Sequence, residues 1–125
     1  MHRSRLAGFI IDCRCEDLEQ ATRFWCQALG LEVRAAAPDP LYRTLDTAAD
    51  EVHIEVQQVR HDSRVHLDIE TDDIEAEVLR LEKLGARRIG TVKGWCVMQA
   101  PTGQRFCVVR PQRADFATRA NRWNE

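Results

Sequence analysis

The chain has 125 residues and a formal net charge of −2, with 44% hydrophobic and 30% charged residues. This length suits one domain, and the composition is that of a globular chain, which excludes a disordered one. Because the 18 basic and 20 acidic residues are scattered along the sequence, they create no strong positive field, and we expect no nucleic-acid partner.

The sequence shows neither the pattern of a membrane span nor that of a secretion signal. No apolar run reaches the roughly 18 residues of a membrane span, and the N-terminal stretch turns acidic where a signal peptide would stay apolar. The five cysteines are an odd number, which argues against a disulfide framework. We therefore expect a cytoplasmic protein with reduced thiols and no membrane partner.

The first elements predicted along the chain are a strand and a helix. Residues 8–13 ("GFIIDC") are an apolar strand, and Asp17 followed by Gln20 is typical of a helix N-cap with its N3 partner. The helix should end at Gly30, a residue suited to a left-handed C-cap. Its apolar stripe consists of Leu18, Ala21, Trp25 and Leu29.

Three strand-like stretches follow this helix, at residues 31–37, 42–47 and 51–59. They are separated by "PDP", from Pro38 to Pro40, and by "TAADE". The first half of the chain thus predicts one strand, one helix and then three strands.

The second half repeats this order at a spacing of about 55 residues. Residues 65–70 are a strand, Asp72 followed by Glu75 predicts the next N-cap, and the helix should end at Gly85. Its apolar stripe consists of Ile74, Val78, Leu81 and Leu84. Strand-like stretches follow at residues 86–92, 95–100 and 105–111.

The repeat predicts an α+β fold of two βαβββ modules, at about residues 5–60 and 64–111, within one domain of residues 1–112. One module alone could not bury its half-covered sheet, so the two modules should pack together. We expect the tail, residues 113–125, to be docked on the body or frayed.

The order of these elements, with "FWCQALGLEV", "HLDIETDDIEAEVLRLEKLGA" and "APTGQRFCVV" at their places, resembles the vicinal oxygen chelate superfamily and in particular its small glyoxalase-like domain proteins. The resemblance implies a curved mixed sheet with helices on its convex face, a central cleft for a small organic molecule, and a homodimer. Relatives include glyoxalases, extradiol dioxygenases, methylmalonyl-CoA epimerase and bleomycin resistance proteins. Since such folds serve many activities, the fold alone does not decide the function.

The resemblance also implies one divalent metal held by residues of the first, fourth, fifth and eighth strands. His66 stands at the fifth-strand position and Gln57 or Glu55 near the fourth, whereas Gly8 and Cys107 fall about at the first-strand position and the eighth-strand glutamate position. Gly8 has no side chain to coordinate with. We therefore expect a degenerate site without a metal cofactor. Two alternatives stay open: a divalent metal on His66 with Gln57 or Glu55, and zinc through His66, Cys107 and Glu55.

Strand periodicity predicts which side chains line the cleft. Alternation should turn Val52, Ile54 and Val56, and likewise Val65, Leu67 and Ile69, toward the helices, and the polar residues between them toward the cleft or water. Tyr42 and Trp95 suit an aromatic rim, and Arg43 and Arg105 suit an anionic group of a ligand. The predicted cleft residues are Glu55, Gln57, His66, Asp68, Trp95, Arg105 and Cys107.

These observations favour a small-molecule-binding glyoxalase-like protein with a degenerate metal site, and whether it is an enzyme stays open. The alternative is a divalent-metal-dependent lyase, isomerase or dioxygenase that uses His66 with Glu55 or Gln57. A third hypothesis is an accessory subunit whose modules serve association. A thermal shift with any small molecule would argue against this third hypothesis, since only a ligand that prefers the folded state raises the midpoint.

Overall fold

The computed structural model describes residues 1–34 and 39–124 and confirms the α+β class. The helices and strands are β1 (His2–Arg14), α1 (Leu18–Leu29), β2 (Tyr42–Leu45), β3 (His53–Val59), β4 (Arg64–Thr71), α2 (Ile74–Lys83), β5 (Arg87–Val92), β6 (Trp95–Gln99), β7 (Arg105–Val109), α3 (Phe116–Arg119) and β8 (Asn121–Trp123). Among these residues, no helix combines the length and apolar character needed to cross a membrane.

The chain divides into two compact units. Unit 1 contains Met1–Gly8 and His66–Glu125, and unit 2 contains Phe9–Val65. The strands β1 and β4 each run from one unit into the other. Each unit therefore holds one of the two longer helices and several strands.

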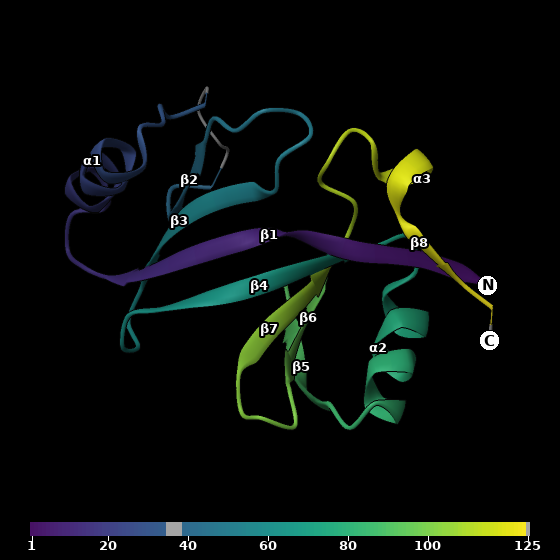
Figure 1. Cartoon of the computed structure of the whole chain (residues 1–125). Coiled ribbons are helices and arrows are strands. Elements are labelled where there is room, and N and C mark those ends of the chain that lie inside the picture. Colours follow the sequence, from purple (N-terminus) through teal and green to yellow (C-terminus); the bar gives the residue numbers. More distant parts are fainter. Residues whose placement is uncertain (35–38, 125) are drawn as a thin grey trace. The chain divides into compact units, whose positions relative to one another are not determined.

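The sheet of unit 1 is mixed, as predicted. Its strands follow the order β1, β4, β7, β6, β5, with β4 and β7 parallel and β6 antiparallel to both β7 and β5 (Figure 1). The short strand β8 adds to the beginning of β1, where His2 pairs with Trp123.

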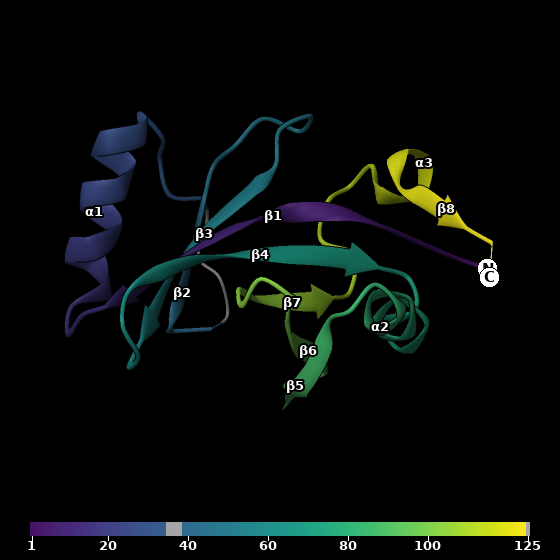
Figure 2. The same cartoon turned by 60° about the horizontal axis from the view of Figure 1, so that its bottom comes forward.

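The helix α2 packs on one face of this sheet, and Figure 2 shows it nearly end-on beside β5, β6 and β7. The core between them consists of Val78, Leu81, Cys96, Met98, Phe106 and Val108, joined by Ile69. Because side chains alternate along a strand, the residues between these core positions lie on the face opposite α2.

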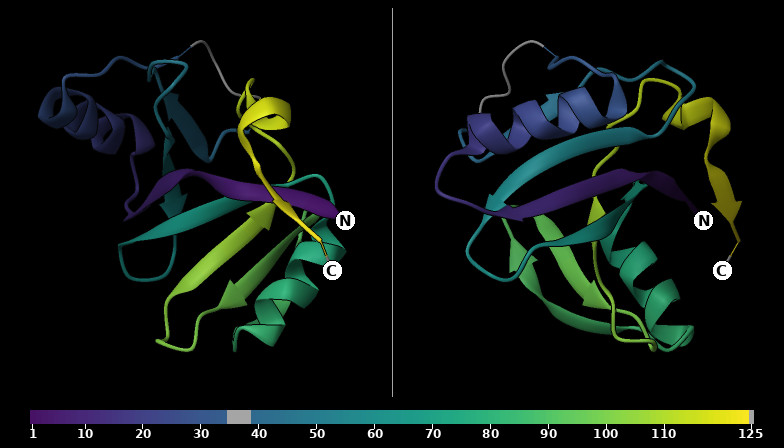
Figure 3. Two further views of the ribbon diagram at one scale, coloured as in Figure 1. Left: turned by 45° about the vertical axis from the view of Figure 1, so that its right-hand side comes forward. Right: turned by 60° about the vertical axis from the view of Figure 1, so that its left-hand side comes forward.

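In unit 2, α1 packs on the hairpin of β2 and β3 and lies alongside β3 in the right-hand view of Figure 3. The core consists of Cys13, Leu18, Leu45 and Val56, with Ile54 and Trp25 packed against it. Ile54 and Val56 thus face the helix as predicted.

The ends of α1 confirm the capping prediction. The Asp17 side chain accepts hydrogen bonds from the backbone N–H groups of Glu19 and Gln20, at 3.0 and 3.2 Å. Gly30 closes the helix in the left-handed conformation with φ of 69°, which side chains other than glycine adopt at a cost.

The predicted N-cap of α2 was wrong by one residue. Asp73 caps this helix and accepts from the backbone N–H of Ala76 at 3.0 Å. Asp72 instead accepts from the backbone N–H of Arg3 in β1, at 2.8 Å. A contact with another strand therefore decided which of the two adjacent aspartates became the cap.

Three further expectations need correction or lie partly outside the described residues. Of the predicted strand 31–37, Val33 forms an isolated bridge with Leu45, and residues 35–37, like Pro38 of the predicted "PDP" break, lie outside the described part of the chain. The apolar stripes also end early, because Leu29 and Leu84 are exposed. Both leucines lie at or just past the last helical residue.

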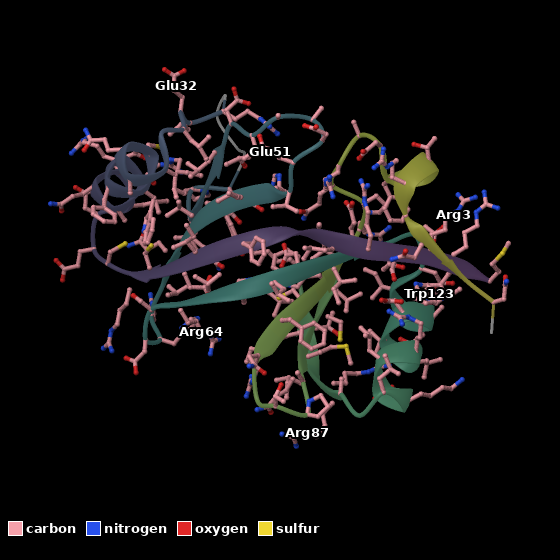
Figure 4. The ribbon with its side chains drawn as sticks, in the orientation of Figure 1. Arg3, Glu32, Glu51, Arg64, Arg87 and Trp123 are labelled. Carbon is pink, nitrogen blue, oxygen red and sulfur yellow. The ribbon has the colours of Figure 1, made fainter. Side chains whose placement is uncertain are left out.

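The C-terminal segment is docked on unit 1. The left-hand view of Figure 3 shows β8 alongside the beginning of β1. The indole N–H of Trp123 donates to the Ser4 hydroxyl at 2.7 Å, and the Arg80 guanidinium lies 3.9 Å from the centre of the Trp123 ring. Figure 4 shows Trp123 beside α2.

Candidate functional site

The candidate site lies on the face of the unit 1 sheet opposite α2. Asp68 in β4 pairs with Cys107 in β7, and Leu67 pairs with Phe106. Since Phe106 belongs to the core under α2, the side chains of Asp68 and Cys107 point to the other face. Alternation along β4 and β7 places His66 and Arg105 on this face as well.

Three chemically active side chains meet there. The ligating atoms of His66, Asp68 and Cys107 all lie within 4.8 Å of one another. The Nε2 atom of His66 is 3.5 Å from Oδ1 of Asp68, and these side chains are only 12% and 7% exposed. Cys107 is a half-buried free thiol. An imidazole, a carboxylate and a thiol are thus held together in a largely desolvated place.

The next strand, β6, extends this face. Val97 pairs with Cys107 and Gln99 pairs with Arg105, and alternation places Trp95 on the same side. Trp95 is half-buried. The Arg105 guanidinium and the Trp95 ring therefore lie on the same face as His66, Asp68 and Cys107.

The C-terminal segment covers the other end of β4. Glu70, which is fully buried, accepts hydrogen bonds from Arg5 Nε at 2.7 Å and from the backbone N–H groups of Gln112 and Arg113 at 2.6 and 2.9 Å. Arg5 also donates to Asp115. This hydrogen bond lowers the pKa of the Asp115 carboxyl.

The sequence reasoning did not identify this network. Alternation from His66 and Asp68 does place Glu70 on the same face, so the strand pattern carried a signal for it. Nothing in the local sequence pointed to Arg5 or to Asp115, because their contacts join distant parts of the chain.

The structure brings together five of the predicted cleft residues on this one face. They are His66, Asp68, Trp95, Arg105 and Cys107. The other two, Glu55 and Gln57, lie on β3 in unit 2, where they pair with Thr44 and Tyr42 of β2.

Other residues singled out in unit 2 have local partners. His53 Nε2 lies 3.1 Å from Glu55 Oε1. Arg43, expected to meet an anionic ligand, donates to Glu19 at 2.7 Å. Its guanidinium is therefore engaged by a carboxylate of the protein itself.

Of the three apolar residues of β4 that were expected to turn toward the helices, one packs on the core under α2. Ile69 packs on the α2 core, but Val65 and Leu67 are 59% and 41% exposed. Asp68 and Glu70 are buried instead. The reason is that the α2 core reaches Ile69 but not Leu67, whereas hydrogen bonds satisfy the buried carboxylate of Glu70.

A separate hollow of about 600 Å³ lies at the beginning of α1 in unit 2. Its walls include Arg14, Asp17, Gln20 and Phe24. Asp17 is already used as the helix cap. None of the predicted cleft residues lines this hollow, so it does not coincide with the converging side chains of unit 1.

Comparison with known proteins identifies the fold. The family model described as "Glyoxalase-like domain" matches residues 8–109. No curated protein matches the chain. The matched range covers most of the sequence and contains His66, Asp68, Trp95, Arg105 and Cys107, whereas Arg5 and the C-terminal segment lie outside it.

Solved structures agree with this match. A glyoxalase/bleomycin resistance protein/dioxygenase superfamily member from Vibrio splendidus 12B01 is 21% identical, with a TM-score of 0.52, over 84% of this chain and 98% of that one. The Mn(II)-bound glyoxalase from Novosphingobium aromaticivorans is 16% identical, with a TM-score of 0.56, over 91% and 44% of the two chains. A Streptomyces coelicolor methylmalonyl-CoA epimerase in complex with 2-nitronate-propionyl-CoA is 15% identical, with a TM-score of 0.52, over 88% and 97%. At these identities the likeness is one of fold.

Proposed function

This chain belongs to the glyoxalase-like domain family, and we propose that it binds a small organic molecule against the unit 1 face that carries His66, Asp68, Arg105 and Cys107. The observation that carries this proposal is the register of β4, β7 and β6, which gathers these polar side chains on the face opposite the α2 core. Binding sites characteristically combine a few convergent polar groups with aromatic or apolar surface.

The side chains of this face favour an anionic ligand. Arg105 lies two residues before Cys107 in β7 and on the same face, and a guanidinium can hold a carboxylate through two parallel hydrogen bonds. Trp95 and Val97 supply aromatic and apolar surface on the same side. The structurally similar epimerase is in complex with 2-nitronate-propionyl-CoA, which supports a small organic ligand as the class.

A thermal-shift screen with 2-oxo and 2-hydroxy carboxylates and their matching amides tests this proposal. We expect carboxylates, but not amides, to raise the unfolding midpoint. A carboxylate at 100 times its dissociation constant should add about 2.7 kcal/mol to the free energy of unfolding. Arg105→Gln should abolish the shift. Arg43→Gln is the matched control, because Arg43 is already paired with Glu19, and it should keep the shift. Equal shifts with acids and amides, or a full shift in Arg105→Gln, would contradict the anionic class.

A second candidate is a divalent-metal-dependent lyase, isomerase or dioxygenase. The convergence of His66, Asp68 and Cys107 favours it, and a solved structure of similar fold is a Mn(II)-bound glyoxalase. A bound divalent ion would supply Lewis acidity to an oxygen of the ligand. That Glu55 or Gln57 joins His66 as a metal ligand remains a hypothesis. Turnover of an oxo compound that chelation abolishes would establish this candidate over simple binding.

Two further parts of the proposal concern the protein as a whole. Association into a homodimer and a cytoplasmic location remain predictions. The exposed apolar residues Phe24 and Leu29 of α1 support association. Light scattering at several concentrations measures the oligomeric state directly.

A further inference from the structure

We infer that residues 110–116, the segment that follows β7, form an end wall of the proposed ligand-binding face and limit its ligands to short carboxylates. This inference rests on the proposed function and narrows its ligand class. It gives a role in specificity to a segment that contains none of the predicted cleft residues.

The ligand-binding face is closed at one end and more open at the other. At the carboxyl end of the two parallel strands, Glu70 of β4 pairs with Val109 of β7. Glu70 is fully buried and Val109 is only 5% exposed. His66 and Arg105, four residues earlier in the same strands, are half-buried. Because side chains alternate along a strand, all four lie on the same face, so burial increases along this face toward Glu70 and Val109.

The segment 110–116 supplies the cover at the closed end. The Glu70 carboxylate accepts hydrogen bonds from the backbone N–H groups of Gln112 and Arg113, at 2.6 and 2.9 Å. Since the Glu70 side chain lies on the face opposite α2, these two N–H groups lie on that side of the sheet as well. In the views of Figure 1 and Figure 2, the chain after β7 passes behind β4 and β1 on its way to α3. The segment therefore crosses the ligand-binding face at the level of Glu70.

Arg5 holds the end wall in place. Its Nε atom donates to Glu70 at 2.7 Å, and another nitrogen of the same guanidinium donates to Asp115. The guanidinium carbon also lies 5.9 Å from the centre of the buried Phe116 ring. Release of the segment would leave the buried carboxylate of Glu70 without its backbone donors, which is costly. The wall is therefore a fixed part of the face.

The order of side chains along β7 determines how an acid meets the wall. Arg105, at the more open end, suits the carboxylate of the ligand, and Cys107 and Val109 follow at steps of two residues. The carbon chain points toward Val109, because the carboxylate of Glu70 repels a second negative charge there. A parallel strand rises about 3.3 Å per residue, so Val109 lies only about 7 Å beyond Cys107. A few carbon atoms fill this distance, and a longer chain collides with the wall.

A series of 2-oxo carboxylates of increasing length tests the inference on the full chain by calorimetric titration. We expect 2-oxopropanoate and 2-oxobutanoate to bind. We expect 2-oxooctanoate to bind at least about tenfold more weakly, because methylene groups forced into a packed site cost free energy. Asp115→Asn and Arg5→Gln remove contacts that hold the wall, and each should reduce this preference for short acids. Asp50→Asn makes the same change as Asp115→Asn at an exposed aspartate outside unit 1, and it should keep the preference.

Hydrogen–deuterium exchange examines the wall without a ligand. The backbone N–H groups of Gln112 and Arg113 should exchange slowly in the wild type, because they donate to a buried carboxylate. They should exchange faster in Arg5→Gln, and circular dichroism should show that each variant is folded.

The possible outcomes separate this inference from the proposed function. Equal affinity of the wild type for 2-oxobutanoate and 2-oxooctanoate would overturn the end wall and leave the ligand-binding face standing. Fast exchange of both N–H groups in the wild type, or an unchanged preference for short acids in both Asp115→Asn and Arg5→Gln, would do the same. Binding of no acid of any length would overturn the proposed function and the length limit with it.

Discussion

At the scale of single residues, the buried carboxylates show most clearly how hydrogen bonds compensate for the burial of a charge. Glu77 in α2 is fully buried, a position that is costly for a charge without partners. Its oxygens accept hydrogen bonds from His2 at 2.7 Å, from Ser4 at 2.8 Å and from the Arg80 guanidinium at 2.8 Å. These contacts tie α2 to the beginning of β1.

Glu77 should make stability depend on pH. Burial by itself would raise the pKa of Glu77, but the hydrogen bonds from Arg80, His2 and Ser4 outweigh burial and lower it. A carboxyl with a lowered pKa in the folded state stabilises the fold above its ordinary pKa of 4.5. This contribution is lost as the pH falls through the lowered value.

Glu77→Gln should therefore lower the free energy of unfolding by about 3 kcal/mol at neutral pH, since it breaks a buried ion pair. The difference from the wild type should shrink as the pH falls below 4.5. Urea denaturation at several pH values measures both effects. Glu75→Gln on the exposed side of the same helix is the control and should change little. A difference that does not vary with pH would contradict the role assigned to Glu77.

Helix ends show what decides structure at the scale of an element. Asp72 and Asp73 are equally good N-cap residue types, and the sequence pattern selected the wrong one because Glu75 lies three residues after Asp72. In the structure Asp72 accepts from the backbone of Arg3, and Asp73 is left to cap the helix. The choice between two adjacent caps was made by a strand distant in sequence.

Replacement of the cap tests this assignment. Asp73→Ala should destabilise the protein by about 1 kcal/mol, and Asp73→Ser should restore most of the loss because serine is also a good N-cap. Asp72→Ser should not restore the stability that Asp72→Ala loses, because Asp72 accepts a hydrogen bond from the backbone of β1 and does not cap the helix. Chemical denaturation of the four variants measures these differences. Rescue by serine at position 72 but not at position 73 would show that Asp72 is the cap.

At the scale of the whole molecule, unit 1 is assembled from both ends of the chain. Met1–Gly8 and the residues after His66 form one compact unit, and β8 pairs with the beginning of β1. The predicted modules, at 5–60 and 64–111, assign the beginning of β1 and the C-terminal segment differently. The structure adds both to the unit that carries the candidate site.

Trp123 joins β8 to Ser4 of β1 and to Arg80 of α2, so its removal should destabilise unit 1. Trp123→Ala loses a cation–π contact with Arg80 and a hydrogen bond to Ser4, which together are worth about 2–3 kcal/mol. Arg122→Ala, at the neighbouring exposed position, is the control and should have little effect. Denaturant unfolding measures the change. Equal stability of both variants would show that the tail is docked without contributing to the fold.

Much of the fold could be predicted because its signals are local. Alternation correctly turned Ile54 and Val56 of β3 toward the helix, and Asp17 and Gly30 correctly marked the ends of α1. The burial of the polar residues of β4 could not be predicted in the same way. That burial depends on donors such as Arg5, whose contact with Glu70 joins distant parts of the chain.

The sequence by itself determined the repeated strand–helix order, the α+β class and the side of each strand on which a residue lies, because capping and side-chain periodicity are local properties. Only the tertiary structure decided which residues of different strands meet. Periodicity assigns a face but not a register, and the parallel pairing of β4 with β7 is what sets Asp68 opposite Cys107. The convergence of His66, Asp68 and Cys107 follows from that register.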